Sequence, residues 1–136
     1  MNHFVILITL FLFSKLSMAN DLTNKPECKN AQPPQNIVFN NEFFESIRSG
    51  RKIATTRKGI RCFKAGQIVS ALDNEKNEVL KLTIKEVLEK TFYTLDEKIA
   101  RAEDATLEEL QIGLVEIYGE EIKNSPLSVI YFQLLD

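Results

Sequence analysis

The segment that most constrains the fold is EVLKLTIKEVLEKTF, residues 78 to 92. Its apolar residues fit one face of an amphipathic helix poorly in the first half, although the second half fits a helix or a strand equally well. We therefore predict a long, bent strand. A strand that ends near Leu72 precedes it, and the polar residues 73–77 between the two predict a hairpin turn.

The remaining segments place helices and further strands around this hairpin. Asn40 or Asn41 can cap a helix over residues 42–49 that ends at Gly50, and Thr106 with Glu109 forms a capping box that opens a helix through about Tyr118. The other predicted elements are strands at 37–39, 53–57, 68–72 and 128–135 and a short helix at 96–104. This order contains no βαβ repeat, so we expect an α+β domain whose antiparallel or mixed sheet curls into a small barrel.

The N-terminal residues differ in character from the rest. Residues 4–13 form an apolar run too short to span a bilayer, and small residues precede a plausible cut ahead of Asn20, so residues 1–19 are predicted to be a signal peptide. The alternative is an uncleaved N-terminal anchor. We expect an exported protein, periplasmic or secreted, that has no stable membrane insertion after processing. Residues 20–36 are predicted to be a linker or N-terminal arm, and residues 37–136 a single domain.

Composition excludes several kinds of site. The formal charge of −2 argues against a general nucleic-acid binder. The only histidine is His3, inside the expected signal peptide, which leaves the domain without Ser-His-Asp or Cys-His nucleophile arrangements and without histidine-bound zinc. No metal site and no cofactor is expected. Cys28 and Cys62 either pair, as exported cysteines can, or remain two buried thiols.

The stretch GRKIATTRKG, residues 50–59, gathers cations around two threonines. On a strand, Thr55 and Arg57 share a face, so Lys52 reaches Thr55 only from the turn after Gly50. We expect Arg51 and Arg57 to lower the pKa of Lys52, so that its neutral amine removes the Thr55 proton while Arg57 stabilises an oxyanion or anchors a polar substrate edge. The alternative is a set of solvated cations at a helix C-terminus.

Several other residues are weaker candidates. Cys62 lies near arginines that would acidify its thiol, which makes it a second choice of nucleophile. Three tyrosines have the spacing of core residues, and these are Tyr93, Tyr118 and Tyr131.

Five stretches together resemble the small bacterial ASCH-domain proteins of the N4-acetylcytidine amidohydrolase type. They are FFESIRSGRKIATTR, FKAG, LDEKIARAEDATLEEL, EIYG and the late VIYF. The resemblance covers residue 37 to the C-terminus and implies a PUA-like β-barrel with flanking helices. It also implies a hydrolase in which Lys52 is the base, Thr55 the nucleophile and Glu103 the proton donor. The chain departs from the family at Ile53, where a threonine is usual, and in the basic loop KGIRC after Arg57.

The resemblance therefore implies a hydrolase that removes the acetyl group from N4-acetylcytidine or a related acylated cytosine nucleoside. Arg57 and Arg51 are the expected substrate-binding residues. The alternative is a non-catalytic ASCH module that holds a nucleotide or RNA through Arg51, Lys52, Arg57 and Arg61. A structural role for a small exported protein is a third possibility. The sequence makes no prediction of oligomeric state.

Overall fold

The computed structural model of the protein describes residues 21–22 and 25–135. The expected signal peptide at residues 1–19 lies outside the described residues. Within the described part, no helix is long and apolar enough to cross a membrane.

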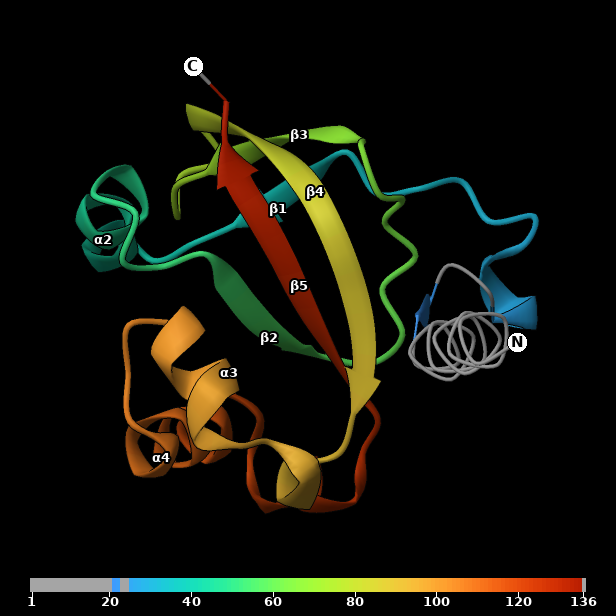
Figure 1. Ribbon diagram of the computed structural model, residues 1–136, viewed down its shortest axis with the longest axis vertical. Coiled ribbons are helices and arrows are strands. Elements are labelled where there is room, and N and C mark those ends of the chain that lie inside the picture. The colour runs from blue at the N-terminus through green and yellow to red at the C-terminus, as the bar shows by residue number, and fades with distance from the viewer. Residues whose placement is uncertain (1–20, 23–24, 136) are drawn as a thin grey trace, which may run out of the picture.

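The described part is built on a single mixed sheet of five strands (Figure 1). The strands are β1 (Asn36–Val38), β2 (Ala54–Lys58), β3 (Ile68–Leu72), β4 (Glu78–Lys90) and β5 (Leu127–Leu134), in the spatial order β1-β3-β4-β5-β2. Only β1 and β3 run parallel. The predicted hairpin and long bent strand are confirmed, because β4 pairs with both β3 and β5 and its register shifts between Ile84 and Glu86.

In the part of the chain that the structure describes, three α-helices flank the curled sheet, which gives the α+β class that the sequence predicts. They are α2 (Phe44–Arg48), α3 (Glu97–Ala102) and α4 (Leu107–Tyr118), and Figure 1 shows α3 and α4 together beside β2. Short 3-10 helices cover Pro26–Cys28, Asn41–Phe43, Phe92–Thr94 and Glu120–Asn124. The expected helix at 42–49 begins as one of these, at Asn41–Phe43, and the predicted cap is not formed by Asn40, whose side chain makes no capping hydrogen bond. The capping box of Thr106 and Glu109 is confirmed.

The core divides into two clusters because β5 is buried on both faces. Alternate side chains of a strand point to opposite faces, so Ile130 and Phe132 pack into the hollow of the sheet with Phe39 and Ile47. Leu127 and Val129 point the other way and pack with the residues of α3 and α4. The edge strand β2, paired with β5, therefore lies where these two clusters meet.

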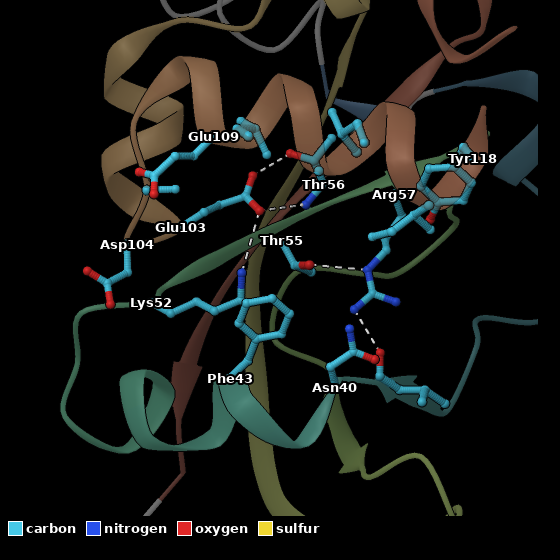
Figure 2. Close-up of a pocket in the computed structure, with 16 residues that line it drawn as sticks. Asn40, Phe43, Lys52, Thr55, Thr56, Arg57, Glu103, Asp104, Glu109 and Tyr118 are labelled. Atoms are coloured by element: carbon cyan, nitrogen blue, oxygen red, sulfur yellow. Dashed lines mark hydrogen bonds and ion pairs between the residues drawn. The ribbon is translucent and has the colours of Figure 1, made fainter. Parts of the chain in front are cut away.

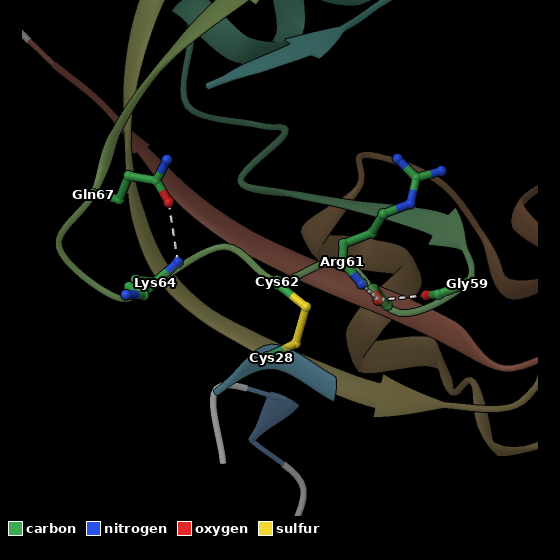
Figure 3. Close-up of a disulfide and its surroundings, with 7 residues drawn as sticks. Cys28, Gly59, Arg61, Cys62, Lys64 and Gln67 are labelled. Atoms are coloured by element: carbon green, nitrogen blue, oxygen red, sulfur yellow. Dashed lines mark hydrogen bonds between the residues drawn. A yellow bond between two sulfur atoms is a disulfide. The ribbon is translucent and has the colours of Figure 1, made fainter. Parts of the chain in front are cut away.

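A disulfide between Cys28 and Cys62 fastens the N-terminal arm to the domain (Figure 3). Leu22 of that arm is fully buried in the core. The bond joins positions 34 residues apart, and closing a loop of that length stabilises the folded state by about 4 kcal/mol in the chain-entropy model. Pairing also corrects one expectation: Cys62 has no free thiol and is not a nucleophile.

The loop that follows β2 is held from its other side by Ser128, a fully buried residue of β5. Its hydroxyl donates to the Gly59 carbonyl at 2.6 Å and accepts from the Arg61 backbone N–H at 2.9 Å. Figure 3 shows this contact beside the disulfide. The basic loop KGIRC, where the chain departs from the ASCH pattern, is thus held by the Ser128 hydroxyl, by the disulfide and by a hydrogen bond from the Gly59 N–H to the Pro126 carbonyl.

Candidate functional site

A cavity of about 440 Å³ opens at the edge of the sheet beside β2 (Figure 2). Three parts of the chain line it: the strand β2 with the turn before it, the helix α4 with the residues that precede it, and the segment from Val38 to Phe43. Sites for small molecules have volumes in this range. Lys52, Thr55, Arg57 and Glu103, four of the residues singled out from the sequence, all line this one cavity.

The backbone around Gly50 places Lys52 at the cavity. Gly50 ends α2 with a φ of 81°, a conformation that glycine adopts without strain. The N–H groups of Arg51 and Lys52 then both donate to the Ser46 carbonyl at 3.0 Å. An isolated antiparallel bridge pairs Lys52 with Glu103 at the end of α3. As the sequence predicts, Lys52 therefore lies in the turn before β2 rather than on the strand.

Lys52 and Glu103 form a buried pair. Their side chains are only 5% and 7% exposed, and the Lys52 Nζ lies 3.5 Å from the Glu103 Oε1. The amine also lies 4.8 Å from the centre of the Phe43 ring. Burial lowers the pKa of Lys52 below its ordinary value of 10.5, the negative charge of Glu103 opposes that shift, and the positive charge of Arg57 adds to it. The main cause of the lowered pKa is desolvation.

Arg51 does not lie beside Lys52 in the cavity, although the sequence analysis expects it to lower the pKa of Lys52 and to bind substrate. Its Nε lies 3.2 Å from the Asp104 Oδ2, both side chains are largely exposed, and Arg51 does not line the cavity. Of the two guanidinium groups expected to act on Lys52, Arg57 alone contributes to the lowered pKa. The prediction was incomplete because sequence spacing cannot show that Asp104, 53 positions away, draws Arg51 outward.

Thr55 and Arg57 share a face of β2, as predicted. The Arg57 Nε donates to the Thr55 Oγ1 at 3.1 Å, and its Nη2 donates to the Val38 carbonyl at 2.8 Å. The guanidinium also lies 5.2 Å from the centre of the Phe39 ring. These contacts fix Arg57 beside the hydroxyl of Thr55, a residue that is only 4% exposed.

Thr56 points to the opposite face of β2 and holds Glu103. Its hydroxyl donates to the Glu103 Oε2 at 2.5 Å, and its backbone N–H donates to the Glu103 Oε1 at 3.3 Å. Both carboxylate oxygens are therefore hydrogen-bonded, which offsets the cost of burying them. The sequence analysis missed Thr56, because nothing in the sequence shows that the end of α3 packs against this face of β2.

No hydrogen bond joins Lys52 to Thr55 among the described contacts, although both line the cavity. The amine is directed to Glu103, and the hydroxyl is paired with Arg57 (Figure 2). A proton that passes from Thr55 to Lys52 must therefore use a shifted side chain or a bound water, as occurs in many enzymes once substrate is present.

Tyr93 differs from the prediction that the three tyrosines are core residues, because it is 71% exposed. Tyr118 and Tyr131 pack against the second core cluster, as predicted, and Tyr118 also lines the cavity. The departure at Ile53 lies outside the cavity, with a side chain that is 44% exposed. In the described residues, no group of three or more histidine, cysteine, aspartate or glutamate side chains could hold a metal ion.

The fold of the described residues is similar to that of several solved structures. The structure is similar to an ASCH domain from Lactobacillus crispatus JV V101, with a TM-score of 0.62 and 16% identity over 93% of this chain and 92% of that one. The fold is that of an ASCH domain. A protein from Enterococcus faecalis V583 of the DUF984 family is similar to this ASCH fold with a TM-score of 0.58 and 20% identity, over 79% of this chain and 83% of that one.

An ASCH protein from Zymomonas mobilis is also similar, with a TM-score of 0.54 and 16% identity over 74% of this chain and 66% of that one. No protein-family model and no curated protein matches the chain. Identities this low establish the fold alone. They confirm the predicted PUA-like, ASCH-type α+β architecture.

Replacing Thr56 by valine tests how Glu103 is held. The variant keeps the shape of the side chain and leaves the Glu103 Oε2 without its hydroxyl partner, so we expect the free energy of unfolding to fall by about 1–3 kcal/mol. Urea denaturation measures the change. The matched control is Thr83→Val, at a half-buried position of β4, for which we expect a change of about 0.5 kcal/mol or less. Equal losses in the two variants would contradict a specific role for Thr56.

Proposed function

We propose that the protein is an amidohydrolase that removes the acetyl group from N4-acetylcytidine or a related acylated cytosine nucleoside. The observation that carries the proposal is the buried pair of Lys52 and Glu103, 3.5 Å apart, in a cavity that also contains Thr55. These are the three residues to which the ASCH resemblance assigns a base, a proton donor and a nucleophile. The ASCH fold supports the assignment.

The burial of Lys52 supports the neutral amine that the proposal requires, because desolvation lowers the pKa of this lysine. An ammonium beside a carboxylate and an amine beside a carboxylic acid differ only by the position of one proton. A proton that the Lys52 amine takes from Thr55 can therefore pass across the 3.5 Å between the two groups to Glu103. Glu103 can then donate that proton, and Lys52 is an amine again.

The proposed reaction proceeds in two steps. The Lys52 amine removes the Thr55 proton, the Thr55 Oγ1 attacks the acetyl carbonyl carbon, and Glu103 protonates the nitrogen that leaves as the cytidine amine. The acetyl group is then an ester on Thr55. Lys52 then takes a proton from a water molecule, which attacks the carbonyl carbon of this ester. The bond between that carbon and the Thr55 oxygen breaks, acetate is released, and the proton taken by Lys52 passes through Glu103 to restore the Thr55 hydroxyl.

Arg57 has a supporting part in this proposal. It donates to the Thr55 oxygen through Nε, so its positive charge lies beside the atom that becomes negative during attack. Its other contacts, with the Val38 carbonyl and the Phe39 ring, keep it there without help from substrate. Such preorganised charge is the usual source of transition-state stabilisation.

Turnover of N4-acetylcytidine by the purified protein tests the proposal. We expect the wild-type protein to release cytidine and acetate, and Lys52→Met and Thr55→Val each to lower kcat at least about 100-fold. Chromatography of the nucleosides measures the rate. Lys58→Met is the matched control, because Lys58 forms an exposed ion pair with Glu121. Full turnover in Lys52→Met would refute the mechanism, and wild-type binding without turnover would indicate a binding module instead.

The pH dependence of the reaction tests the protonation state of Lys52. Since the pKa of Lys52 is lowered from 10.5, we expect kcat/KM to rise with pH through a midpoint below that value, as the amine loses its proton. The unfolded chain holds this proton up to about pH 10.5, whereas the folded protein loses it at a lower pH. Lys52 therefore makes the free energy of unfolding rise with pH between its pKa in the folded protein and 10.5. A pH–rate profile measures the midpoint. A flat profile across neutral and alkaline pH would contradict a neutral lysine base.

We further propose that the protein is exported. The apolar run at residues 4–13 and the Cys28–Cys62 disulfide support this, since structural disulfides form mainly in oxidising compartments. We expect the protein recovered from the exported fraction of expressing cells to begin at Asn20 and to carry the bond between Cys28 and Cys62. Mass spectrometry of the intact and digested protein measures both. An N-terminus at Met1 with two free thiols would contradict export.

A further inference from the structure

Gly113 interrupts the side-chain wall that α4 presents to the cavity. The helix lines the cavity over two and a half turns, from Glu109 to Tyr118 at its two ends (Figure 2). Leu110 and Ile117, three residues before and four residues after Gly113, line the same cavity. Residues at this spacing lie on one helix face. The wall therefore has an aliphatic side chain on each side of a position that has none.

The fold gives no reason for a glycine at this position. Gly113 lies inside α4 and, unlike Gly50, Gly59, Gly66 and Gly119, does not have a positive φ. A Cβ built at Gly113 would meet no atom within 4 Å, so alanine fits without any shift of its neighbours. Glycine is also among the poorest helix-forming residues. The space beside Gly113 is thus free in the protein itself, and the helix is less stable for it.

We propose that Gly113 is a specificity-determining residue that leaves room for the planar part of the substrate against α4. The inference rests on the proposed function, and it concerns a residue that has no part in the steps of the proposed reaction. In an N4-acylated cytosine the amide is conjugated with the pyrimidine ring, so the two form one flat group. Without a Cβ in the way, such a group can pack directly on the helix backbone between Leu110 and Ile117.

The distribution of polar groups in the cavity favours the ring over the sugar at this place. Lys52, Thr55 and Arg57 belong to β2 or the turn before it, and the polar side chains that α4 brings to the cavity, Glu109 and Tyr118, lie at the two ends of its cavity face. The wall formed by Leu110, Gly113 and Ile117 offers apolar surface, and the helix backbone has its own hydrogen bonds. Ribose hydroxyls placed there would lose their partners in water, whereas a flat ring loses little.

A size series at position 113 tests the inference. The variants are Gly113→Ala, Gly113→Val and Gly113→Leu, and the measurements are kcat and KM for N4-acetylcytidine, calorimetric Kd for the product cytidine, and Tm. We expect KM and Kd to rise with side-chain size, by about tenfold or more for leucine, while kcat stays within about twofold. We expect the Tm of Gly113→Ala to exceed that of the wild-type protein. The opposite directions of stability and affinity separate a ligand gap from a structural role.

Glu116→Leu is the matched control, because Glu116 is exposed on α4 and does not line the cavity. Its KM and Kd are expected to equal those of the wild-type protein. If the wild-type protein binds cytidine and Gly113→Leu binds it equally well, the inference about Gly113 is wrong and the proposed function stands. If the wild-type protein neither hydrolyses N4-acetylcytidine nor binds cytidine, the proposed function is wrong and the inference fails with it.

Discussion

The burial of one lysine beside one glutamate is the interaction on which the rest of this site depends. Removing two charged groups from water is costly unless each is paired and hydrogen-bonded. The protein satisfies both conditions with residues from separate segments: Lys52 comes from the turn after α2, Glu103 from the end of α3, and Thr56 from β2. The site can therefore exist only when these three segments are packed together, which links its chemistry to the fold.

The position of β2 explains how neighbouring threonines come to have different partners. Thr55 and Thr56 point to opposite faces of the strand, where Thr55 contacts Arg57 and Thr56 contacts Glu103. In a central strand these faces would be separated by the sheet. Because β2 is an edge strand, one cavity reaches around it and includes both hydroxyls. Thr55 is thus placed to be the nucleophile of the proposed reaction, while its neighbour Thr56 holds the proposed proton donor, Glu103.

Local patterns in the sequence were enough to predict most of the fold. The poor fit of residues 78–92 to a helix face, the capping box at Thr106 and the stop at Gly50 each depend on residues within a few positions. The hairpin, α4 and the turn before β2 could therefore be placed. The candidate site was harder to predict than the fold. Strand parity correctly joined Thr55 to Arg57, but the outward pairing of Arg51 with Asp104 and the hydrogen bond between Thr56 and Glu103 depend on packing between distant segments. The cavity wall on α4 was missed for the same reason.

The link between Cys28 and Cys62 makes the integrity of this domain depend on its surroundings. Cys62 lies on the connection between β2 and β3, so the sulfur bridge fastens the N-terminal arm to the chain that leaves the strand bearing Thr55. A copy kept among reduced thiols lacks that fastening and exposes a looser arm to proteases. The same polypeptide would thus be a durable molecule outside the reducing interior of a cell and a short-lived one within it.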